Sequence, residues 1–289
     1  MMRRALRDRF DRRLRSSSTP LSAEELRRPA VVLAPHPDDE TLGCGGLIAL
    51  KRDLDVPVTV VFMTDGGGSH AHLIGSERLV ALRRDEAREA CDRLGVEPSE
   101  VHFLDIEDGK LDDSTERGIE LLAPHLDRAD DPQLIVPHPD EPPPGHRATF
   151  HIADVALRRA EVSLDGLLFA VWLWDQFPFP NPLTGLGERT SPQAIARLAW
   201  RGRLGSGMPG QLTRRADVGS VLERKRHALD AHATQMSRLD DRPDWVTLGD
   251  VAGGDWLDRL VGPVEYFAER TIGPDRAPGH PESPRSAAR

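Results

Sequence analysis

The chain has 289 residues, a formal net charge of −9 at pH 7 and 38% hydrophobic residues. This length and apolar content suffice for one catalytic domain with additions. The acidic balance argues against nucleic acid as the main partner, because phosphate backbones are bound by basic surfaces. No stretch approaches the roughly 20 apolar residues that span a bilayer, and Cys44 and Cys91 do not make a disulfide framework. We therefore expect a soluble, cytoplasmic protein with a small-molecule partner, and leave a homo-oligomer open.

The N-terminal segment, residues 1–28, forms a basic arm with seven arginines among its first 15 residues. It lacks the continuous apolar core of a secretion signal, so we expect a frayed or surface-docked helix. The alternative is an arm that binds a membrane surface or an acidic partner, because Leu6, Phe10 and Leu14 recur at four-residue spacing. A linker over residues 16–20 and a short helical piece lead into the main domain, which we place at residues 29–272.

The stretch from residue 31 to residue 46 combines an apolar run, a group of potential metal ligands and several glycines. The apolar run over residues 31–34 is typical of a buried strand in a parallel sheet, and Pro35 and Pro37 disfavour helix in the residues that follow. We therefore expect the polar residues to lie in a loop at the carboxyl end of the strand. Ligands bind at that edge in open α/β sheets.

Strands and helices alternate after this stretch, as they do in βαβ units. We predict strands over residues 31–34, 56–63, 101–104, 134–136 and 167–174, and helices over residues 43–52, 76–94, 116–126 and 147–159. The predicted fold class is α/β: a Rossmann-like, mostly parallel sheet flanked by helices, with a metal site at the carboxyl ends of the strands.

The C-terminal third has a weaker pattern. Residues 183–215 are rich in glycine and proline and predict no element, whereas residues 218–236 predict a helix. Residues 255–261 are a weaker helical candidate, and residues 264–271 are compatible with either helix or strand. The Pro, Arg and Ser composition of residues 273–289 predicts a disordered tail.

His36 and Asp39 are three residues apart on the predicted turn and can face one cation, with a third ligand supplied from elsewhere. Three protein ligands leave a position open for water, as in catalytic zinc sites. Asp38 is then the natural general base, and Glu40 is expected to anchor the loop. The alternative for the carboxylates alone is a solvated acidic turn, but the histidine between two prolines favours a metal site.

The segment His36-Pro37-Asp38-Asp39-Glu40, with the Thr-Leu-Gly-Cys-Gly-Gly that follows, resembles the signature of the LmbE-like (PIG-L) family of metal-dependent de-N-acetylases. Later stretches resemble the family in the same order, namely residues 64–66, 83–95, 108–111, 146–149 and 225–235. The resemblance covers residues 30–270. It implies a Rossmann-like fold and hydrolysis of an N-acetyl amide, commonly on an amino sugar, with zinc held by two histidines and an aspartate.

Carried over to this sequence, the resemblance makes His36 and Asp39 ligands, Asp38 the base and His146 the third ligand. Arg83 and Asp108 become candidate substrate contacts; the alternatives are a helix-surface salt bridge for Arg83 and a turn-forming role for Asp108.

Two further histidines, His70 on the glycine loop and His232 on a late helix, are candidates to line the pocket. A structural role is the commoner one for a lone histidine. The implied cofactor is Zn²⁺, with another divalent metal such as Fe²⁺ as the alternative.

The second metal motif departs from the family pattern, which commonly reads His-Pro-Asp-His. An ungapped match to His146 places prolines and a glycine before it, so the acid or oxyanion-stabilising histidine of the motif is missing there. We favour His138 as that residue, displaced by the intervening segment, and His146 as the ligand. The other interpretation makes His138 itself the ligand.

The leading hypothesis is a metal-dependent hydrolase that removes an acyl group, expected to be acetyl, from an N-acylated amine such as an N-acetyl amino sugar or its conjugate. One alternative is hydrolysis of another amide, in a natural product or a thiol conjugate. Another is a metal- or ligand-binding member of the fold that has lost catalysis. A nucleotide-binding module is disfavoured, because Gly43, Gly45 and Gly46 lack the spacing of a dinucleotide fingerprint.

Overall fold

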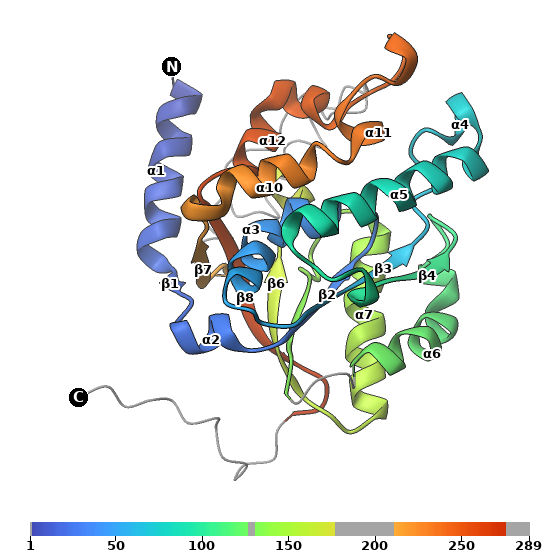
Figure 1. The fold of residues 1–289 in the computed structure, drawn as a ribbon. Helices are drawn as coiled ribbons and strands as arrows, with labels where there is room; N and C mark the ends of the chain where they lie inside the picture. The colour runs from blue at the N-terminus through green and yellow to red at the C-terminus, as the bar shows by residue number, and fades with distance from the viewer. Residues whose placement is uncertain (1, 127–130, 177–210, 276–289) are drawn as a thin grey trace, which may run out of the picture.

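A single twisted sheet organises the part of the chain that the computed structural model describes, residues 2–126, 131–176 and 211–275 (Figure 1). Within these ranges the sheet has eight strands in the order β1-β7-β8-β6-β5-β2-β3-β4. The strands are β1 Thr19–Pro20, β2 Ala30–Ala34, β3 Val58–Thr64, β4 Val101–Ile106, β5 Gln133–Pro137, β6 Leu164–Phe169, β7 Arg214–Asp217 and β8 Val264–Ile272.

The central strands β6, β5, β2, β3 and β4 are parallel, and β8 runs antiparallel to both β6 and β7. Every residue of β2, β3 and β5 is buried, as expected for parallel strands covered on both faces. The fold class predicted from the sequence is therefore confirmed. The ambiguity over residues 264–271 is resolved in favour of a strand.

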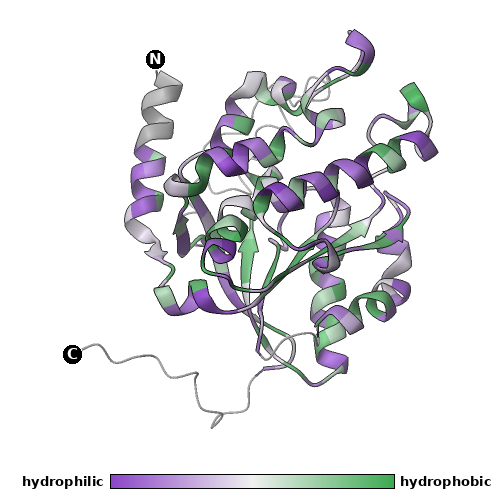
Figure 2. Ribbon diagram, viewed as in Figure 1, coloured by the Kyte–Doolittle hydropathy of each residue, from purple (hydrophilic) through white to green (hydrophobic). Residues whose placement is uncertain are grey.

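Two groups of helices cover the sheet (Figure 1). Helices α3, α5 and α10 pack on one another, and α6 packs on α7. Figure 2 shows hydrophobic strands inside and hydrophilic residues on the outer helical surfaces. The helices are α1 Met2–Ser17, α2 Ala23–Arg27, α3 Asp39–Asp53, α4 Ala71–Ile74, α5 Ser76–Leu94, α6 Thr115–Leu126, α7 Pro144–Arg159, α10 Leu222–Leu229, α11 Ala233–Met236 and α12 Asp255–Leu260, with 3₁₀ turns at Pro98–Glu100, Asp112–Ser114, Trp172–Gln176, Gly219–Val221, Leu239–Asp241 and Leu248–Gly254.

The chain changes direction across the sheet at β2. From β2 it continues to β3 and β4 on one side, and it later returns to β5 and β6 on the other side. The connections that follow β2 and β5 therefore diverge at the carboxyl ends of these two strands. In open α/β sheets this switch point is the usual place for a ligand site.

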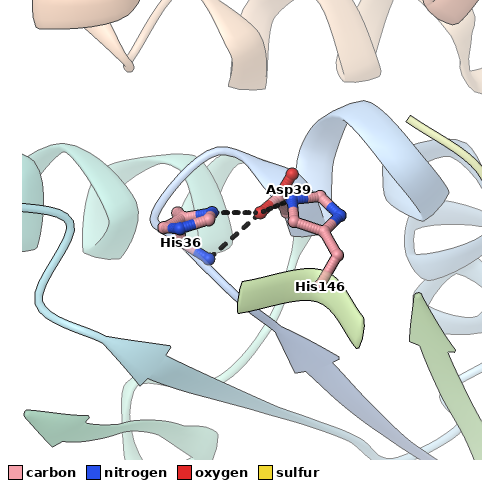
Figure 3. A group of neighbouring side chains, drawn as sticks. All are labelled: His36, Asp39 and His146. Atoms are coloured by element: carbon pink, nitrogen blue, oxygen red, sulfur yellow. Dashed lines mark hydrogen bonds and ion pairs between the residues drawn. The ribbon is translucent and has the colours of Figure 1, made fainter. Parts of the chain in front are cut away.

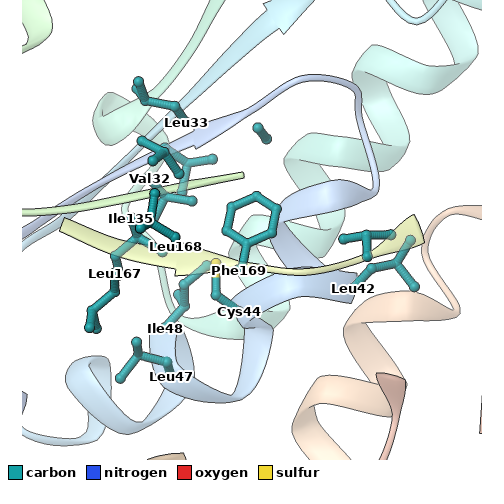
Figure 4. Close-up of a cluster of buried hydrophobic side chains, with 14 of the residues drawn as sticks. Val32, Leu33, Leu42, Cys44, Leu47, Ile48, Ile135, Leu167, Leu168 and Phe169 are labelled. Carbon is teal, nitrogen blue, oxygen red and sulfur yellow. The ribbon is translucent and has the colours of Figure 1, made fainter. Parts of the chain in front are cut away.

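The core is closely packed around Phe169, at the end of β6 (Figure 4). A Cβ added at Gly43 would clash with the Phe169 ring. Helix α3 can approach β6 here because residue 43 has no side chain.

Three predicted elements differ most from the structure, and the others differ by three residues or fewer at either end. Helix α3 begins at Asp39 rather than Gly43, because the prolines end at residue 37 and do not disturb the turns that follow. The strand expected over residues 167–174 ends at Phe169, and residues 172–176 form a 3₁₀ turn. The single helix expected over residues 218–236 is divided into a 3₁₀ turn, α10 and α11.

Two other predictions fall largely outside the described residues. These are the segment over residues 183–215, of which residues 183–210 lie outside the described ranges, and the tail over residues 273–289, of which residues 276–289 lie outside them. Of the former, residues 214 and 215 lie in β7.

The basic N-terminal arm packs against the domain. Phe10 and Leu14 are buried, Arg15 pairs with Asp217 at 2.9 Å, and the expected linker contains β1, which pairs with β7. The arm is thus a docked helix. Two of the apolar residues that suggested membrane binding are used for this packing. None of the helices in the described ranges has the length and apolar character to cross a membrane.

Candidate metal site

Three side chains predicted as metal ligands meet at the switch point of the sheet (Figure 3). Ligand atoms of His36, Asp39 and His146 all lie within 4.8 Å of one another. Asp39 is central: its Oδ2 lies 3.0 Å from Nδ1 of His36 and 3.2 Å from Nε2 of His146. The atoms that could bind one cation therefore surround a single carboxylate oxygen.

Two segments that are distant in sequence supply this cluster. His36 and Asp39 follow β2, and His146 lies in the first turn of α7, after β5. These strands are neighbours in the sheet, so their carboxyl ends lie side by side. A Cβ at Gly145 would lie 3.4 Å from Nε2 of His36, so a glycine here lets α7 begin close to the other histidine.

The electrostatics of the cluster suit a cation. Burial alone would lower the pKa of both histidines, but the carboxylates around them prevail. Asp108 and Asp39 raise the pKa of His36 to about 10, and Asp39 and Glu141 raise that of His146 to about 9. Burial alone would raise the pKa of Asp39, but the two histidines hold it well below its usual range. The cluster and the carboxylates around it therefore carry a net negative charge when both imidazoles are neutral.

The geometry of His146 also fits a metal ligand. This side chain has no exposed surface, yet neither of its ring nitrogens has a well-aligned hydrogen bond to any residue in the described ranges. Buried polar atoms are usually satisfied. Two imidazoles and one carboxylate are a donor set that zinc and other first-row divalent metals accept, so these residues fit the cofactor that the sequence predicts.

Asp38 lies beside the cluster in a strained backbone conformation, with φ 141° and ψ −27°. Non-glycine residues held in such conformations cost about 1–3 kcal/mol and concentrate at functional sites. Burial raises the pKa of Asp38 to about 6, although the Arg83 guanidinium opposes the shift. The side chain is therefore both ionised at neutral pH and basic enough to accept a proton.

Arg83 reaches this loop from α5 and is itself buried, with 3% of its surface exposed. Its guanidinium donates to the Pro37 carbonyl at 2.5 Å, to Asp38 Oδ2 at 3.0 Å and to the Gly66 carbonyl at 2.9 Å. The helix-surface salt bridge considered from the sequence is therefore wrong. In the structure Arg83 holds the loop of Asp38, and its role as a substrate contact stays a prediction.

Glu40 anchors the loop from inside the protein, which confirms the expectation for this residue. It accepts hydrogen bonds from the Asp38 N–H at 3.0 Å and the Thr41 hydroxyl at 2.5 Å. His232 Nε2 lies 2.9 Å from Glu40 Oε1, and both side chains are fully buried. His232 has no exposed surface and supports Glu40 in the structure. Its candidate role as a pocket residue stays a prediction.

Asp108 contacts the other side of His36, with its Oδ1 3.3 Å from Nε2. Its Oδ2 accepts a hydrogen bond from the Gly68 N–H at 3.0 Å, and its own N–H donates to Asp65 at 3.0 Å. Asp108 therefore lies in the site, but the group that it contacts in the structure is a ligand histidine. Asp65, which the sequence analysis did not select, fixes its position.

His138 lies at the end of β5 and is not part of the ligand cluster. Its Nδ1 accepts a hydrogen bond from the Asp140 N–H at 3.1 Å, so the neutral ring carries its proton on Nε2. Burial lowers the pKa of His138. Of the two histidines considered for the third ligand position, the structure brings His146, not His138, to Asp39.

His70 is not brought to the cluster. Its Nε2 lies 2.8 Å from the Val246 carbonyl oxygen, its Nδ1 lies 3.0 Å from the Ser69 hydroxyl, and its ring stacks on Trp245 at 4.2 Å between centroids. Its ring nitrogens and one ring face are used in joining two loops. The structure thus shows a structural role for His70, and its candidate role in lining the pocket stays a prediction.

One buried acidic residue of the site was missed from the sequence. Glu141 has no exposed surface, and its Oε2 lies 3.1 Å from Nδ1 of His146. The signal in the sequence is a pair of carboxylates, Asp140 and Glu141, within a proline-rich segment between two candidate histidines.

Fold and site together define an α/β protein with a candidate His-Asp-His metal centre at the switch point of its sheet. The sequence profile of the family described as "PIG-L: GlcNAc-PI de-N-acetylase" matches residues 31–157. A 1D-myo-inositol 2-acetamido-2-deoxy-alpha-D-glucopyranoside deacetylase of Nocardia farcinica is 30% identical over 257 residues, covering 70% of this chain and 78% of that protein. The chain belongs to the PIG-L (LmbE-like) family, whose deacetylases are metal-dependent.

Two other relatives match over shorter regions. A probable N-acetyl-alpha-D-glucosaminyl L-malate deacetylase 2 of Bacillus subtilis is 33% identical over 30% of this chain and 40% of its own length. A diacetylchitobiose deacetylase of Thermococcus kodakarensis is 32% identical over 48% of this chain and 51% of its own length. The chain thus spans about half or less of these two proteins.

Solved structures share the fold. An A40926 pseudoaglycone deacetylase superposes with a TM-score of 0.55 at 19% identity, over 85% of this chain and 96% of its own. An N,N'-diacetylchitobiose deacetylase from Pyrococcus horikoshii superposes with a TM-score of 0.51 at 21% identity, over 85% of this chain and 84% of its own.

Proposed function

We propose that the chain is a zinc-dependent hydrolase that removes an acetyl group from an N-acetylated amino sugar or its conjugate. The observation that carries the proposal is the meeting of His36, Asp39 and His146 around one carboxylate oxygen, with the basic Asp38 beside them. The names of the matched relatives support the substrate class, because each denotes a deacetylase and several denote conjugates of N-acetylated glucosamine.

His36, Asp39 and His146 would hold the metal. When bound, it would supply a Lewis acid that activates water and polarises the acyl oxygen. We favour Zn²⁺ for the two imidazole ligands, with Fe²⁺ as the alternative. Cys44 and Cys91 are free and buried, in keeping with the reducing cytoplasm that we propose as the location.

The proton transfers fall to the chain's own side chains. Asp38 accepts a proton from the attacking water, and its pKa of about 6 leaves it ionised but basic at neutral pH. His138 carries its proton on Nε2 and is neutral at that pH, since burial lowers its pKa. It donates a hydrogen bond to the developing oxyanion, which is often the largest single contribution to such catalysis. The C–N bond then breaks, and the proton that Asp38 accepted passes to the departing amine.

Acetate release from a panel of N-acetylglucosamine, diacetylchitobiose, and malate and inositol conjugates of N-acetylglucosamine tests the proposal. We expect release from at least one substrate, loss on chelation and recovery with added zinc. Asp38→Asn should lower kcat by about 10²–10⁴-fold with zinc still bound. Stoichiometric zinc without acetate release from any of these compounds would contradict the activity and favour a ligand-binding protein or a hydrolase of another amide.

A further inference from the structure

Glu141 lies in the segment that separates His138 from His146. Its neighbours include Pro139 and Pro142, and its backbone N–H donates to the His138 carbonyl at 3.0 Å. The side chain has no exposed surface, and its Oε2 lies 3.1 Å from Nδ1 of His146. A carboxylate is costly to bury unless its oxygens are satisfied, so its partners indicate what it does.

Three backbone N–H groups of the turn after β6 fix this carboxylate in place. Val171 and Leu173 both donate to Oε1 at 3.0 Å, and Trp172 donates to Oε2 at 2.9 Å. The carboxylate is therefore held by backbone rather than by flexible side chains. These hydrogen bonds fix the position of Oε2 beside Nδ1 of His146.

The direction of this contact determines which nitrogen of His146 is free. A carboxylate beside Nδ1 favours the tautomer with its proton on that atom, which leaves the lone pair on Nε2. Nε2 is the atom that lies 3.2 Å from Asp39. His36 also has one carboxylate at each ring nitrogen, but the two nitrogens are exchanged. Its Nδ1 faces Asp39 and its Nε2 faces Asp108.

We propose that Glu141 is a positioning residue for the metal site: it holds His146 in the orientation and tautomer that present Nε2 to the cation. The proposal rests on the metal site of the proposed function. It gives a purpose to the departure from the family's second motif, because the segment between the two histidines supplies the carboxylate. Such outer carboxylates are typically worth 10–100-fold in metal affinity.

Glu141→Gln removes the charge but keeps the shape. With its oxygen facing Val171 and Leu173, its amide NH₂ would face Trp172 N–H and Nδ1 of His146, and the His146 proton would move to Nε2. We expect zinc affinity of the folded, metal-free protein, measured by competition with a chromophoric chelator, to fall 10–100-fold. Glu107→Gln is the control, because it removes an exposed charge at the same edge of the sheet; it should leave the affinity unchanged.

A carboxylate that serves only the turn would give a different result: Glu141→Gln would lower stability towards urea without changing zinc affinity, and the proposal would be overturned. If the variant fails to fold, ¹⁵N NMR of the histidines in the zinc-loaded wild type tests the proposal instead. The proposal requires His146 to be protonated on Nδ1 with Nε2 bound to zinc, and the opposite assignment contradicts it. Wild-type protein that takes up no zinc would instead overturn the metal site itself.

Discussion

A guanidinium N–H of Arg83 donates to Oδ2 of Asp38 over 3.0 Å, and neither side chain is more than 10% exposed. The same guanidinium also holds the carbonyls of Pro37 and Gly66. Arg83 therefore joins the loop after β2 to the loop after β3 and fixes the strained residue that we propose as the base. The loop that carries the proposed base is thus held by α5, a helix that contributes none of the candidate ligands.

Replacing Arg83 should lower turnover without removing the metal. In Arg83→Lys a single ammonium cannot reproduce the planar fork that reaches three acceptors, so Asp38 loses its orientation. We expect kcat to fall by roughly 10²-fold, as for other misplacements near a reacting centre, while zinc stoichiometry stays at the wild-type value. Arg84→Lys is the matched control, because Arg84 pairs with the half-exposed Asp105. Equal kcat in both variants would show that the Arg83 fork does not position the base.

Truncation of His232 should destabilise the protein. His232→Ala leaves the fully buried Glu40 without its imidazole partner, and removing one member of a buried ion pair costs about 3–5 kcal/mol. We expect a loss on the order of 3 kcal/mol in the free energy of unfolding, measured by urea denaturation of the metal-free protein. His72→Ala, at an exposed histidine, should change it by less than about 0.5 kcal/mol. A similarly small effect at His232 would refute its supporting role.

Lys51 should make stability rise with pH. Its Nζ is buried and donates to the carbonyls of Glu25 and Arg28 at 2.9 and 2.8 Å, and burial, together with Arg28, lowers its pKa to about 7. An unfolded lysine titrates near 10.4, so between pH 7 and pH 10 the unfolded chain binds more protons. Stability conferred by this group therefore increases as pH rises through that window.

The comparison with Lys51→Met isolates this contribution. Between pH 7 and pH 9 the free energy of unfolding of the wild type should gain about 1 kcal/mol or more relative to the variant. The exposed Lys110 provides the control, and Lys110→Met should follow the wild-type profile. Parallel profiles for wild type and Lys51→Met would contradict the lowered pKa.

The regular elements could be predicted because their patterns are local. Residues 76–94 show helical periodicity and end at Gly95, which adopts the left-handed conformation, with φ 88°, that favours glycine. The buried run before His36 likewise predicts its strand. The ligand cluster was predictable in the same sense, because its first two members lie on one short turn and the resemblance points to the third.

What could not be predicted depends on contacts between distant residues. The helical pattern over residues 218–236 does not show that the chain bends at His232 so that its ring meets Glu40, 192 positions away. Glu141 has no local pattern either: its role emerges only when the turn after β6 and the start of α7 are placed around it. The role of Arg83 could not be predicted for the same reason, because an arginine on a helix is usually exposed.

Metal stoichiometry of matched variants tests the central claim most directly. Purified protein loaded with Zn²⁺ and freed of excess should hold one zinc per chain, and Asp39→Ala and His146→Ala should each lose it. His138→Ala should keep the zinc while losing most acetate release, because His138 lies outside the ligand cluster. Zinc lost from His138→Ala but retained by His146→Ala would contradict the account, since the metal would then be held by the other histidine of the displaced motif.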